Sequence, residues 1–252
     1  SERYLTVDGG PAPELWDTRR SRGGVSGFAR VPANTVGGVT FPIPAWLSEE
    51  EASFMEPRGC CVRAVKRAGI QRSDVVVLVG LGSIGLLLTQ LIRHIGARCI
   101  GIELDLKRRQ FAGALGVADS FAGSETDFQQ RLAQATEDRG ADCVLLTAGN
   151  PNLVTSALTW LRAGGSCAIF ASLHPESQVC LDWNQLYYRE LNVVSSYSAS
   201  PADLAEALEL LATRAVSVTE LTKHTFTLER FSDALAAIES RTILKAIMTP
   251  YG

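Results

Sequence analysis

The sequence lacks the features that mark several large classes of protein. None of its six cysteines forms a C-x-x-C pair, so it shows neither the redox motif nor the metal-ligand spacing that such pairs provide. No apolar run approaches the roughly 18 residues that a membrane-spanning helix requires. Charges of both signs are interspersed, the formal net charge is -3, and no basic stripe is present to neutralise phosphates. We therefore expect neither a membrane protein nor a nucleic-acid-binding protein.

The cysteines have a plain interpretation in the absence of such spacing. Most of them lie in apolar segments such as "ADCVLLT" and "GGSCAIF", where a free thiol behaves as a small hydrophobic side chain. We expect free, buried thiols at Cys60, Cys61, Cys99, Cys143, Cys167 and Cys180. The first residues, "SERYLTVDGG", are neither basic nor followed by an apolar signal core, so a cytoplasmic location is expected. Because Ser1 stands where an initiator Met would be, we also expect a trimmed or incomplete N-terminus.

The composition permits a full hydrophobic core. With 252 residues, of which 46% are hydrophobic, the chain can form one large domain or two unequal ones. Residues 1–30 are rich in Gly, Pro and Arg, which is typical of a loop, and short β-type runs broken by prolines follow. Ser48 and Glu51 form a capping-box pattern that predicts a short helix. Pro57 suits the first position of a second helix, which Gly69 is expected to end.

From about residue 75 the pattern becomes regular. Continuous apolar runs, typical of strands buried on both faces of a parallel sheet, alternate with segments of helical period. The predicted strands are 75–80, 99–103, a short one near 120, 143–147, 166–171 and 192–197. The predicted helices lie near 84–96, 106–115, 126–137, 151–162 and 178–189, and two more helices and the strand "LKAIM" follow residue 200. This alternation predicts an α/β fold with a doubly wound parallel sheet of the Rossmann type.

The first of these strands leads into a glycine-rich turn. Gly80, Gly82 and Gly85 stand in G-x-G-x-x-G order between a valine-rich strand and a leucine-rich helix, and Glu103 ends the next strand. This context makes the motif a dinucleotide-binding fingerprint. The first glycine permits a tight turn, the second lets the backbone approach a pyrophosphate, and the third lets the helix pack close to the strand. Ser83 and Ile84 then open the helix, whose free N–H groups face the phosphates.

The acidic residue indicates which dinucleotide is bound. Glu103 is expected to accept hydrogen bonds from the adenosine ribose hydroxyls and to repel a 2'-phosphate, so the sequence favours NAD over NADP. Arg108 lies just past this position and is a further predicted cofactor contact. Because an arginine there can pair with a 2'-phosphate, NADP remains the alternative. The other reading of Arg108 is a solvated residue in the first turn of a helix.

Two loops at the carboxyl ends of later strands are expected to line the same crevice. These are "TAGN" and "ASLHP", both rich in small residues that let a nicotinamide lie against the backbone. The predicted contacts in them are Thr147, Ala148, Gly149, Ala171 and Ser172. His174 is the one histidine that follows a predicted strand directly. It is a candidate general acid or base, and the alternative is a loop histidine with no role.

The order of the motifs resembles the medium-chain dehydrogenase/reductase superfamily, in particular the zinc-type alcohol and polyol dehydrogenases. The matching segments are "GFARVPANTV", "LSEEEASFMEP", the glycine-rich loop with its helix, and "LYYRELNVVSSYSASPADLAEALELL" followed by "LKAIM". The resemblance implies hydride transfer between a nicotinamide cofactor and an alcohol, a polyol or its carbonyl product, by an enzyme that forms homo-oligomers. It also implies three parts: a remnant of a mainly β, GroES-like catalytic domain (1–45), the Rossmann domain (46–198), and a C-terminal segment that returns toward the catalytic domain (199–252).

The resemblance further implies a zinc ion that binds the substrate oxygen and stabilises the alkoxide. Glu56 matches the Glu of the "EP" motif that belongs to the zinc site in relatives. No cysteine precedes Cys60 and no histidine precedes His94, so the N-terminal ligands of relatives are missing from this chain. Arg58 is expected to compete with a metal for the carboxylate of Glu56.

Three hypotheses about function follow from these observations. The chain is part of a zinc-type NAD-dependent alcohol or polyol dehydrogenase, or it is a zinc-independent reductase of the same superfamily. In the second case a tyrosine hydroxyl, of Tyr187, Tyr188 or Tyr197, would act as proton donor, although these side chains fit packing roles as well. In the third case the chain is a non-catalytic dinucleotide-binding or assembly module.

Overall fold

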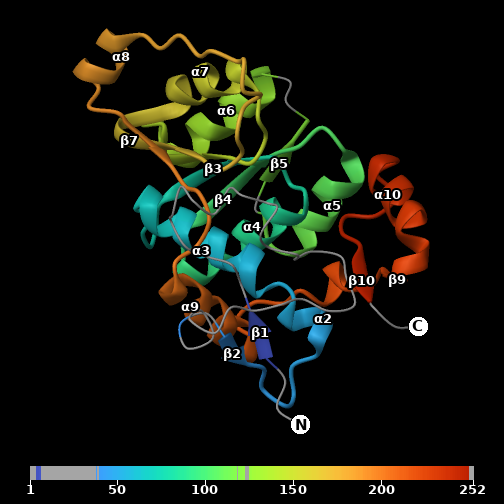
Figure 1. Cartoon of the computed structure of the whole chain (residues 1–252). Coiled ribbons are helices and arrows are strands. Elements are labelled where there is room, and N and C mark those ends of the chain that lie inside the picture. Colours follow the sequence, from blue (N-terminus) through green and yellow to red (C-terminus); the bar gives the residue numbers. More distant parts are fainter. Residues whose placement is uncertain (1–3, 7–37, 39, 118, 123–124, 250–252) are drawn as a thin grey trace. The chain divides into compact units, whose positions relative to one another are not determined.

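The computed structural model describes residues 4–6, 38, 40–117, 119–122 and 125–249, and its elements are shown in Figure 1. The chain divides into two compact units. One comprises Cys60–Tyr197, and the other combines Ser1–Gly59 with Ser198–Gly252. The predicted loop over residues 1–30 and the segment "GFARVPANTV" fall outside the described residues, apart from Tyr4–Thr6.

The unit Cys60–Tyr197 is built on a six-stranded parallel sheet with the order β5-β4-β3-β6-β7-β8. The strands are β3 (Val75–Val79), β4 (Arg98–Ile102), β5 (Asp119–Phe121), β6 (Ala141–Leu146), β7 (Leu161–Ile169) and β8 (Asn192–Ser195). The chain runs outward from β3 in one direction and then resumes on its other side at β6. The predicted doubly wound parallel sheet is therefore confirmed, with its switch point between β3 and β6.

Helices cover both faces of this sheet. They are α4 (Ser83–Ile95), α5 (Leu106–Ala114), α6 (Glu125–Thr136), α7 (Pro151–Trp160) and the short α8 (Trp183–Tyr188). Figure 1 shows α4 and α5 on one side of the strands and α6 and α7 on the other. This division follows from topology, because right-handed crossovers place helices on opposite faces when the direction of strand addition reverses.

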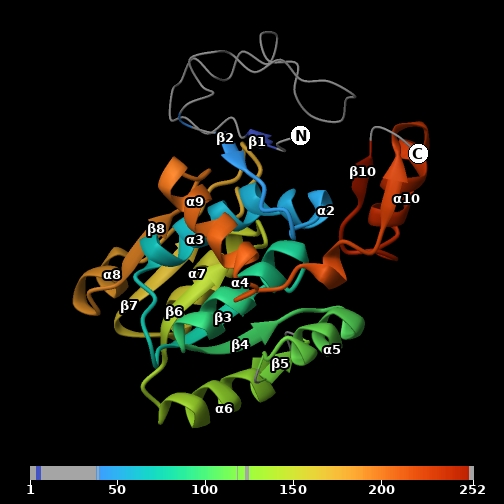
Figure 2. The same cartoon turned by 90° about the horizontal axis from the view of Figure 1, so that it is seen from below.

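Alternate side chains of the central strands form the core on each face. Val75, Val77 and Val79 of β3 pack with Phe128 of α6 and Leu158 of α7 in one buried cluster. The intervening residues of β3 are buried as well, because the opposite face is covered by the leucine-rich α4. Figure 2 shows the strands of this sheet side by side, seen from below. Burial on both faces explains why these strands appear in the sequence as unbroken apolar runs.

Several element boundaries differ from the predicted ones, and three of the differences have a local cause. The second helix, α3 (Met55–Ala68), begins before Pro57, which lies within its first turn. Strand β7 begins at Leu161 rather than at residue 166, because it continues through two glycines and a register shift opposite β6, where an irregular strand tolerates glycine. Helix α8 begins at Trp183 rather than near 178, because the Asp182 side chain caps its first amides.

The other unit contains short elements. β1 (Tyr4–Thr6) pairs antiparallel with β2 (Thr40–Pro42), and β9 (Thr225–Thr227) pairs parallel with β10 (Ile247–Thr249). Its helices are α2 (Glu49–Ala52), the start of α3, α9 (Pro201–Ala212) and α10 (Phe231–Glu239), with 3-10 turns at Thr219–Leu221 and Leu228–Arg230. The capping box is confirmed, since the side chains and amides of Ser48 and Glu51 bond reciprocally. β9 has no counterpart among the predictions because three residues give no periodicity.

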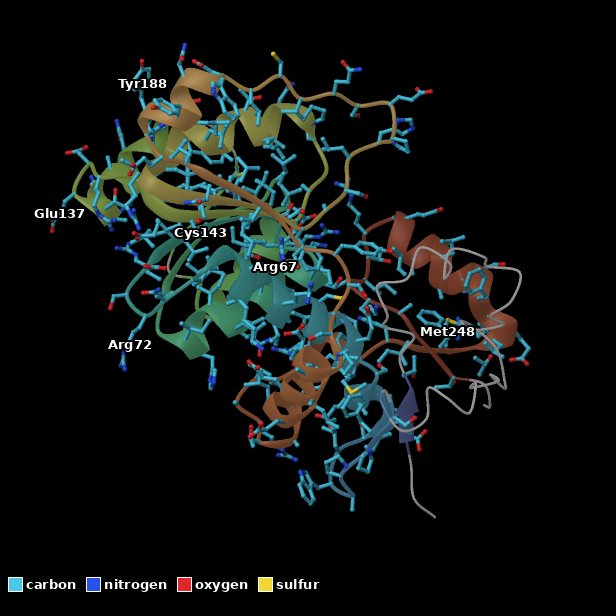
Figure 3. All side chains as sticks on the ribbon, turned by 60° about the vertical axis from the view of Figure 1, so that its left-hand side comes forward. Arg67, Arg72, Glu137, Cys143, Tyr188 and Met248 are labelled. Atoms are coloured by element: carbon cyan, nitrogen blue, oxygen red, sulfur yellow. The ribbon has the colours of Figure 1, made fainter. Side chains whose placement is uncertain are left out.

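None of the six cysteines forms a disulfide bond. Cys61, Cys99, Cys143 and Cys167 are buried as expected, and Figure 3 shows Cys143 within the sheet. Burial raises the pKa of Cys99 to about 12 and that of Cys167 to about 11, so these thiols stay protonated. Cys60 is half-buried and Cys180 is exposed, contrary to the expectation, because Cys180 lies in the extended segment before α8. No described helix has the length and apolarity needed to cross a bilayer.

A buried carboxylate joins three strands at the amino edge of the sheet. Asp142 of β6 accepts hydrogen bonds from Arg139 (2.7 Å), Arg162 of β7 (2.6 Å) and the backbone N–H of Val75 in β3 (2.8 Å). Burial alone would raise the pKa of this carboxyl, but the hydrogen bonds from the two arginines and the amide outweigh it and hold the pKa well below its usual range. Asp142 is therefore ionised in the folded protein.

We expect Asp142→Asn to destabilise the protein by about 2 kcal/mol at pH 7, because it removes a charge that compensates two cations and an amide. The folded-state pKa is depressed, so this contribution is present above the unfolded value of about 4 and is lost as the pH falls below it. Urea unfolding of both proteins at pH 7 and at about pH 3 checks this. Asp119→Asn, which removes an exposed ion pair with Arg98, is the control and should cost less than about 1 kcal/mol. If the difference in free energy of unfolding between wild type and Asp142→Asn is as large at about pH 3 as at pH 7, Asp142 does not have the depressed pKa described here.

Candidate cofactor site

A cavity of about 540 Å³ opens at the carboxyl edge of the sheet, at the switch point between β3 and β6. Its volume lies in the range of small-molecule and cofactor sites. Most of the predicted cofactor residues line it: Gly80, Gly82, Ser83, Ile84, Gly85, Glu103, Arg108, Thr147 and Ala148. The fold thus brings together residues from the ends of three strands and the starts of two helices.

The turn between β3 and α4 has no room for side chains at two of its glycines. Gly80 has a φ of 94°, a left-handed conformation that favours glycine, and an added Cβ would overlap the Thr147 hydroxyl. A Cβ at Gly85 would overlap the carbonyl oxygen of Gly80. Thr147 fixes this arrangement, because its hydroxyl donates to the carbonyls of Val79 (2.9 Å) and Gly80 (3.0 Å). The fold itself therefore requires the first and third glycines.

Gly82 differs from both neighbours. Its φ of -72° and ψ of -168° are open to any residue, and the nearest atom to an added Cβ is Arg108 Nη1 at 3.7 Å. Nothing among the described residues requires a glycine here. A glycine that protein packing does not explain, at the mouth of a cavity, leaves space for the close approach of a ligand.

The start of α4 faces this space. Gly82 is the N-cap residue and provides no side-chain hydrogen bond to the first turn, so the first amides of the helix lack the capping that a Ser or Asp would give. Free N–H groups at a helix N-terminus, together with the positive end of the helix dipole, form a site for an anion. Ser83 and Ile84 of this turn line the cavity. The geometry therefore fits a phosphate group at this position.

Glu103 is held in a fixed orientation at the end of β4. One carboxylate oxygen accepts the N–H of Leu81 (2.9 Å) and the other accepts the N–H of Asp105 (3.0 Å). The guanidinium of Arg108 lies 3.7 Å from the first of these oxygens. The side chain is nearly buried yet still lines the cavity. Sequence reasoning did not anticipate that Glu103 ties the glycine-rich loop to β4; each oxygen keeps a lone pair for a further donor.

An apolar surface adjoins Glu103. Leu104 lines the cavity although its side chain is 77% exposed, and Ile102 and Leu153 also contribute to the lining. None of the three was predicted. A single leucine after the acidic strand end forms no pattern in the sequence, so nothing there identifies it; exposed beside the cavity, its side chain offers an apolar contact to a planar ring.

The loop after β6 lies opposite the glycine-rich turn. Thr147 and Ala148 line the cavity, and so does Asn150, whose side chain caps α7. Gly149, Ala171 and Ser172 are not part of the lining. Gly149 instead lies directly against the backbone of Ser172, with no room for a Cβ. The structure therefore brings the two predicted loops together, but only the first of them reaches the cavity.

The candidate proton-transfer residues lie outside this cavity. His174 is on the exposed loop after β7, where its Nδ1 accepts the N–H of Glu176 at 3.4 Å. Tyr187, Tyr188 and Tyr197 are exposed by 67%, 79% and 75%, and Figure 3 shows Tyr188 pointing outward from α8. None of the four lines the cofactor cavity.

The described residues do not fit a zinc ion. Among them, no group of three or more His, Cys, Asp or Glu side chains lies close enough together to hold a metal. Glu56 is exposed in the first turn of α3, while Arg58 two positions later is buried. A structural or catalytic zinc site requires three or four such ligands, so the described residues alone do not form one.

Comparison with known proteins places these features in a family. Residues 83–213 match the model of the zinc-binding dehydrogenase family, a range that starts in the glycine-rich turn and ends after α9. The chain belongs to this family. It is part of the medium-chain dehydrogenase/reductase superfamily, and the resemblance stated from the sequence is confirmed.

Individual relatives agree with the assignment. A sorbitol dehydrogenase from Halalkalibacterium halodurans is 30% identical over 210 residues, which are 82% of this chain and 61% of that protein. The structure of a protein assigned as a zinc-binding dehydrogenase from Sinorhizobium meliloti, bound to NADP, superposes with a TM-score of 0.78 at 27% identity over 84% of this chain and 63% of the other. An alcohol dehydrogenase from Thermus sp. ATN1 shares the fold, with a TM-score of 0.79 at 20% identity over 85% and 62% of the two chains. The chain thus spans about three fifths of the length of these relatives.

The two kinds of glycine predict different outcomes on substitution. Gly85→Ala should destabilise this protein by about 3 kcal/mol, because the added Cβ would overlap the backbone of Gly80, which cannot move aside. Gly82→Ala should change the free energy of unfolding by less than about 1 kcal/mol, because the Cβ enters open space. Urea unfolding followed by circular dichroism measures both values. Equal destabilisation by the two substitutions is incompatible with the assigned geometry.

Proposed function

We propose that this chain binds NAD(H) and forms the cofactor half of an alcohol or polyol dehydrogenase. The observation that carries the proposal is the open Gly82 beneath the uncapped start of α4, within a cavity that also contains a fixed carboxylate. Protein packing explains neither the glycine nor the uncapped helix. Both are explained by a ligand with a diphosphate and an adjoining ribose.

The proposed binding mode assigns each part of the cofactor to described residues. The pyrophosphate lies over Gly82 against the amides of Ser83 and Ile84. The adenosine ribose donates its hydroxyls to the remaining acceptor sites of Glu103, and the adenine contacts Leu104. The nicotinamide end extends toward the loop that contains Thr147 and Ala148. When bound, the cofactor accepts or donates the hydride; the residues of this chain hold and orient it.

The choice of NAD over NADP rests on charge. A 2'-phosphate would lie next to the Glu103 carboxylate, whose two backbone hydrogen bonds keep it from turning away. Like charges at such short range repel strongly in a partly buried site. Arg108 is the group that favours NADP, but its guanidinium already lies beside Glu103. The relative bound to NADP is the reason to test this choice directly.

The alcohol or polyol class is supported by family membership and by relatives named sorbitol dehydrogenase. The chain spans less than two thirds of the length of those proteins. That it catalyses the oxidation of an alcohol or polyol is therefore proposed, on the basis of these relatives. The zinc-independent alternative is less well supported, since its candidate tyrosines lie outside the cavity. A non-catalytic dinucleotide-binding module remains the second candidate, favoured by the lack of a proton-transfer group among the residues that line the cavity.

We also propose a cytoplasmic location, because free thiols persist in reducing compartments.

Titration of the protein with NADH, followed by nicotinamide fluorescence, tests the proposal. Oxidation of a panel of alcohols and polyols with NAD is measured alongside. Binding with turnover supports the dehydrogenase, and binding without turnover on any substrate supports the module. The absence of NADH binding at millimolar concentration contradicts both.

Glu103→Gln should reduce the preference for NADH over NADPH by about tenfold, which corresponds to about 1.4 kcal/mol. The substitution removes the charge but keeps an oxygen that accepts the N–H of Leu81. Dissociation constants for both cofactors, measured for wild type and variant, give the ratio. Asp119→Asn, a carboxylate outside the cavity, is the matched control and should leave the ratio unchanged. An unaltered ratio in Glu103→Gln refutes the role of this carboxylate in selection.

We propose further that the protein pairs with a second copy of itself through β8, one of the two edge strands of the described sheet. Ser196 N–H points to β7, where it bonds the Ile169 carbonyl, so the alternating geometry turns the N–H and C=O of Val193 outward. Such a residue exchanges two hydrogen bonds with an identical edge across a two-fold axis. Trp183, Tyr187 and Tyr188 beside it are exposed by 67% to 79%, and exposed aromatic clusters of this kind are typical of interfaces.

Val193→Lys should convert a dimer to a monomer, since edge lysines prevent strand pairing. Light scattering after size exclusion measures the mass of each protein over a range of concentrations. Ile238→Lys replaces an exposed apolar residue of α10 with similar exposure and should leave the mass unchanged. A wild-type protein that stays monomeric, or a dimer that survives Val193→Lys, excludes this interface.

A further inference from the structure

A second cavity, of about 290 Å³, lies away from the cofactor site. It is bounded by one side of α6, by the turn from α6 to β6, and by the end of α7. The turn precedes β6 and the end of α7 precedes β7, so this cavity is at the amino edge of the parallel sheet. The cofactor cavity is at the carboxyl edge, and the two share no lining residue.

The floor and one end of the cavity are rigid. Leu132 is buried, and Ala133 beside it has a side chain too small to fill the space. The hydroxyl of Thr136 donates to the Leu132 carbonyl (2.7 Å) and accepts the N–H of Gly140 (3.1 Å). The N–H of Asp138 bonds the Ala133 carbonyl at 2.9 Å. These bonds fix the backbone of the turn, which places the exposed Asp138 at one end of the cavity.

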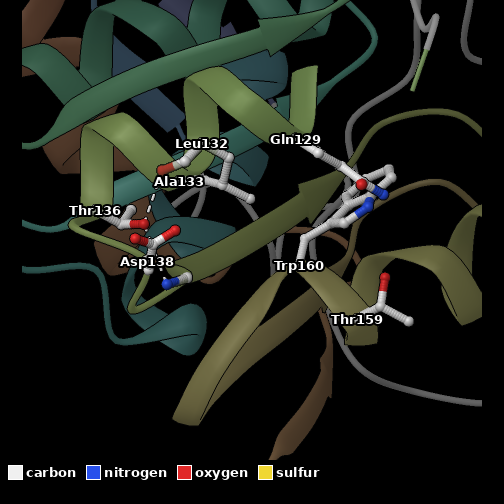
Figure 4. A pocket seen from close by; sticks show the side chains of 8 residues that line it. Gln129, Leu132, Ala133, Thr136, Asp138, Thr159 and Trp160 are labelled. Carbon is white, nitrogen blue, oxygen red and sulfur yellow. Dashed lines mark hydrogen bonds between the residues drawn. The ribbon is translucent and has the colours of Figure 1, made fainter. Parts of the chain in front are cut away.

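The other end is aromatic. Trp160, the last residue of α7, packs edge to face on Phe128, with ring centroids 4.9 Å apart and an interplanar angle of 68°. The indole is only partly buried and lines the cavity. Figure 4 shows Trp160 and Gln129 at one end, Thr136 and Asp138 at the other, and Leu132 and Ala133 between them. The cavity therefore offers an acidic end, an apolar middle and an aromatic end.

The polar groups at both ends are unused within the described part of the chain. No hydrogen bond or ion pair there involves the carboxylate of Asp138, the indole N–H of Trp160 or the side-chain amide of Gln129. The nearest cation in sequence, Arg139, is bound by Asp142 through two hydrogen bonds of 2.7 and 3.1 Å. The exposed carboxylate of Asp138 is thus not paired with a cation among the described residues, and such a carboxylate attracts a cation.

We propose that this cavity is a binding site for a small organic cation that carries an ammonium or guanidinium group at one end and an aromatic ring at the other. The cationic group pairs with Asp138, the linker lies over Leu132 and Ala133, and the ring contacts Trp160. Charge-assisted hydrogen bonds to a carboxylate are roughly twice as strong as neutral ones, and offset or edge contacts between aromatic rings favour binding further. Nothing in this arrangement depends on the cofactor site.

The test uses the whole protein and a series of simple probes: phenylethyl-, phenylpropyl- and phenylbutylammonium. Isothermal titration should show saturable binding of at least one of them. The alcohol of the same length, which lacks the charge, should bind at least about tenfold more weakly. Asp138→Asn should weaken binding of the ammonium probe by a similar factor, and Asn tolerates the left-handed conformation of this position, where φ is 59°.

Glu137→Gln is the matched control. It removes a neighbouring carboxylate that does not line the cavity and that Figure 3 shows pointing away from the protein, so binding should be unchanged. Trp160→Leu should weaken binding of the ammonium probe and of the alcohol by a similar factor, because both probes lose the same aromatic contact. NADH affinity, measured in every variant, should stay at the wild-type value. If no probe of the series binds, or if Asp138→Asn and Glu137→Gln weaken binding equally, the site does not exist as described.

Discussion

The close approach of Gly85 to the Gly80 carbonyl is the constraint on which the cofactor site depends. It starts α4 directly at the end of β3, and the Thr147 hydroxyl holds the same turn against β6. With α4 fixed in this position, its first amides face the cavity and Gly82 stands open beneath them. Glu103, at the end of β4, accepts the N–H of Leu81 and so connects β4 to the glycine-rich turn. A site for a diphosphate and a ribose thus results from backbone positions that the fold already requires.

The two edges of the sheet have different roles: the amino edge contains a cluster that stabilises the fold, and the carboxyl edge contains the candidate cofactor site. At the amino edge Asp142 joins β3, β6 and β7, and its charge is fully compensated by two arginines and an amide. At the carboxyl edge the acceptors and amides are only partly satisfied, which is typical of positions that bind ligands. The cavity between Asp138 and Trp160 is an exception at the amino edge. Its unused carboxylate lies next to Arg139, whose guanidinium belongs to the Asp142 cluster, and this is why Asp138 lacks a counter-ion.

The sequence predicts those parts of the structure that local rules determine. The central strands, α4, the capping box of Ser48 and the doubly wound parallel sheet follow from apolar runs, cap residues and crossover handedness. The start of β7 does not, because its glycines interrupt the apolar run while the backbone continues in the sheet. Leu104 was missed because a single exposed leucine has no pattern, and the contact of Glu103 with Leu81 depends on the pairing of β3 with β4. Gly149 and Ser172 were predicted from their loops, but whether a loop residue lines a cavity or packs on another loop depends on the tertiary structure.

Hydrogen–deuterium exchange of the full chain, with and without saturating NADH, tests the central claim most directly. Bound NADH should slow the exchange of backbone amides in residues 80–86 and 103–108, where the pyrophosphate and the ribose are assigned. Residues 137–142 at the opposite edge of the sheet should exchange at the same rate in both samples. Unchanged exchange across residues 80–86 in the presence of NADH would contradict the account, because a cofactor bound as described must cover the start of α4.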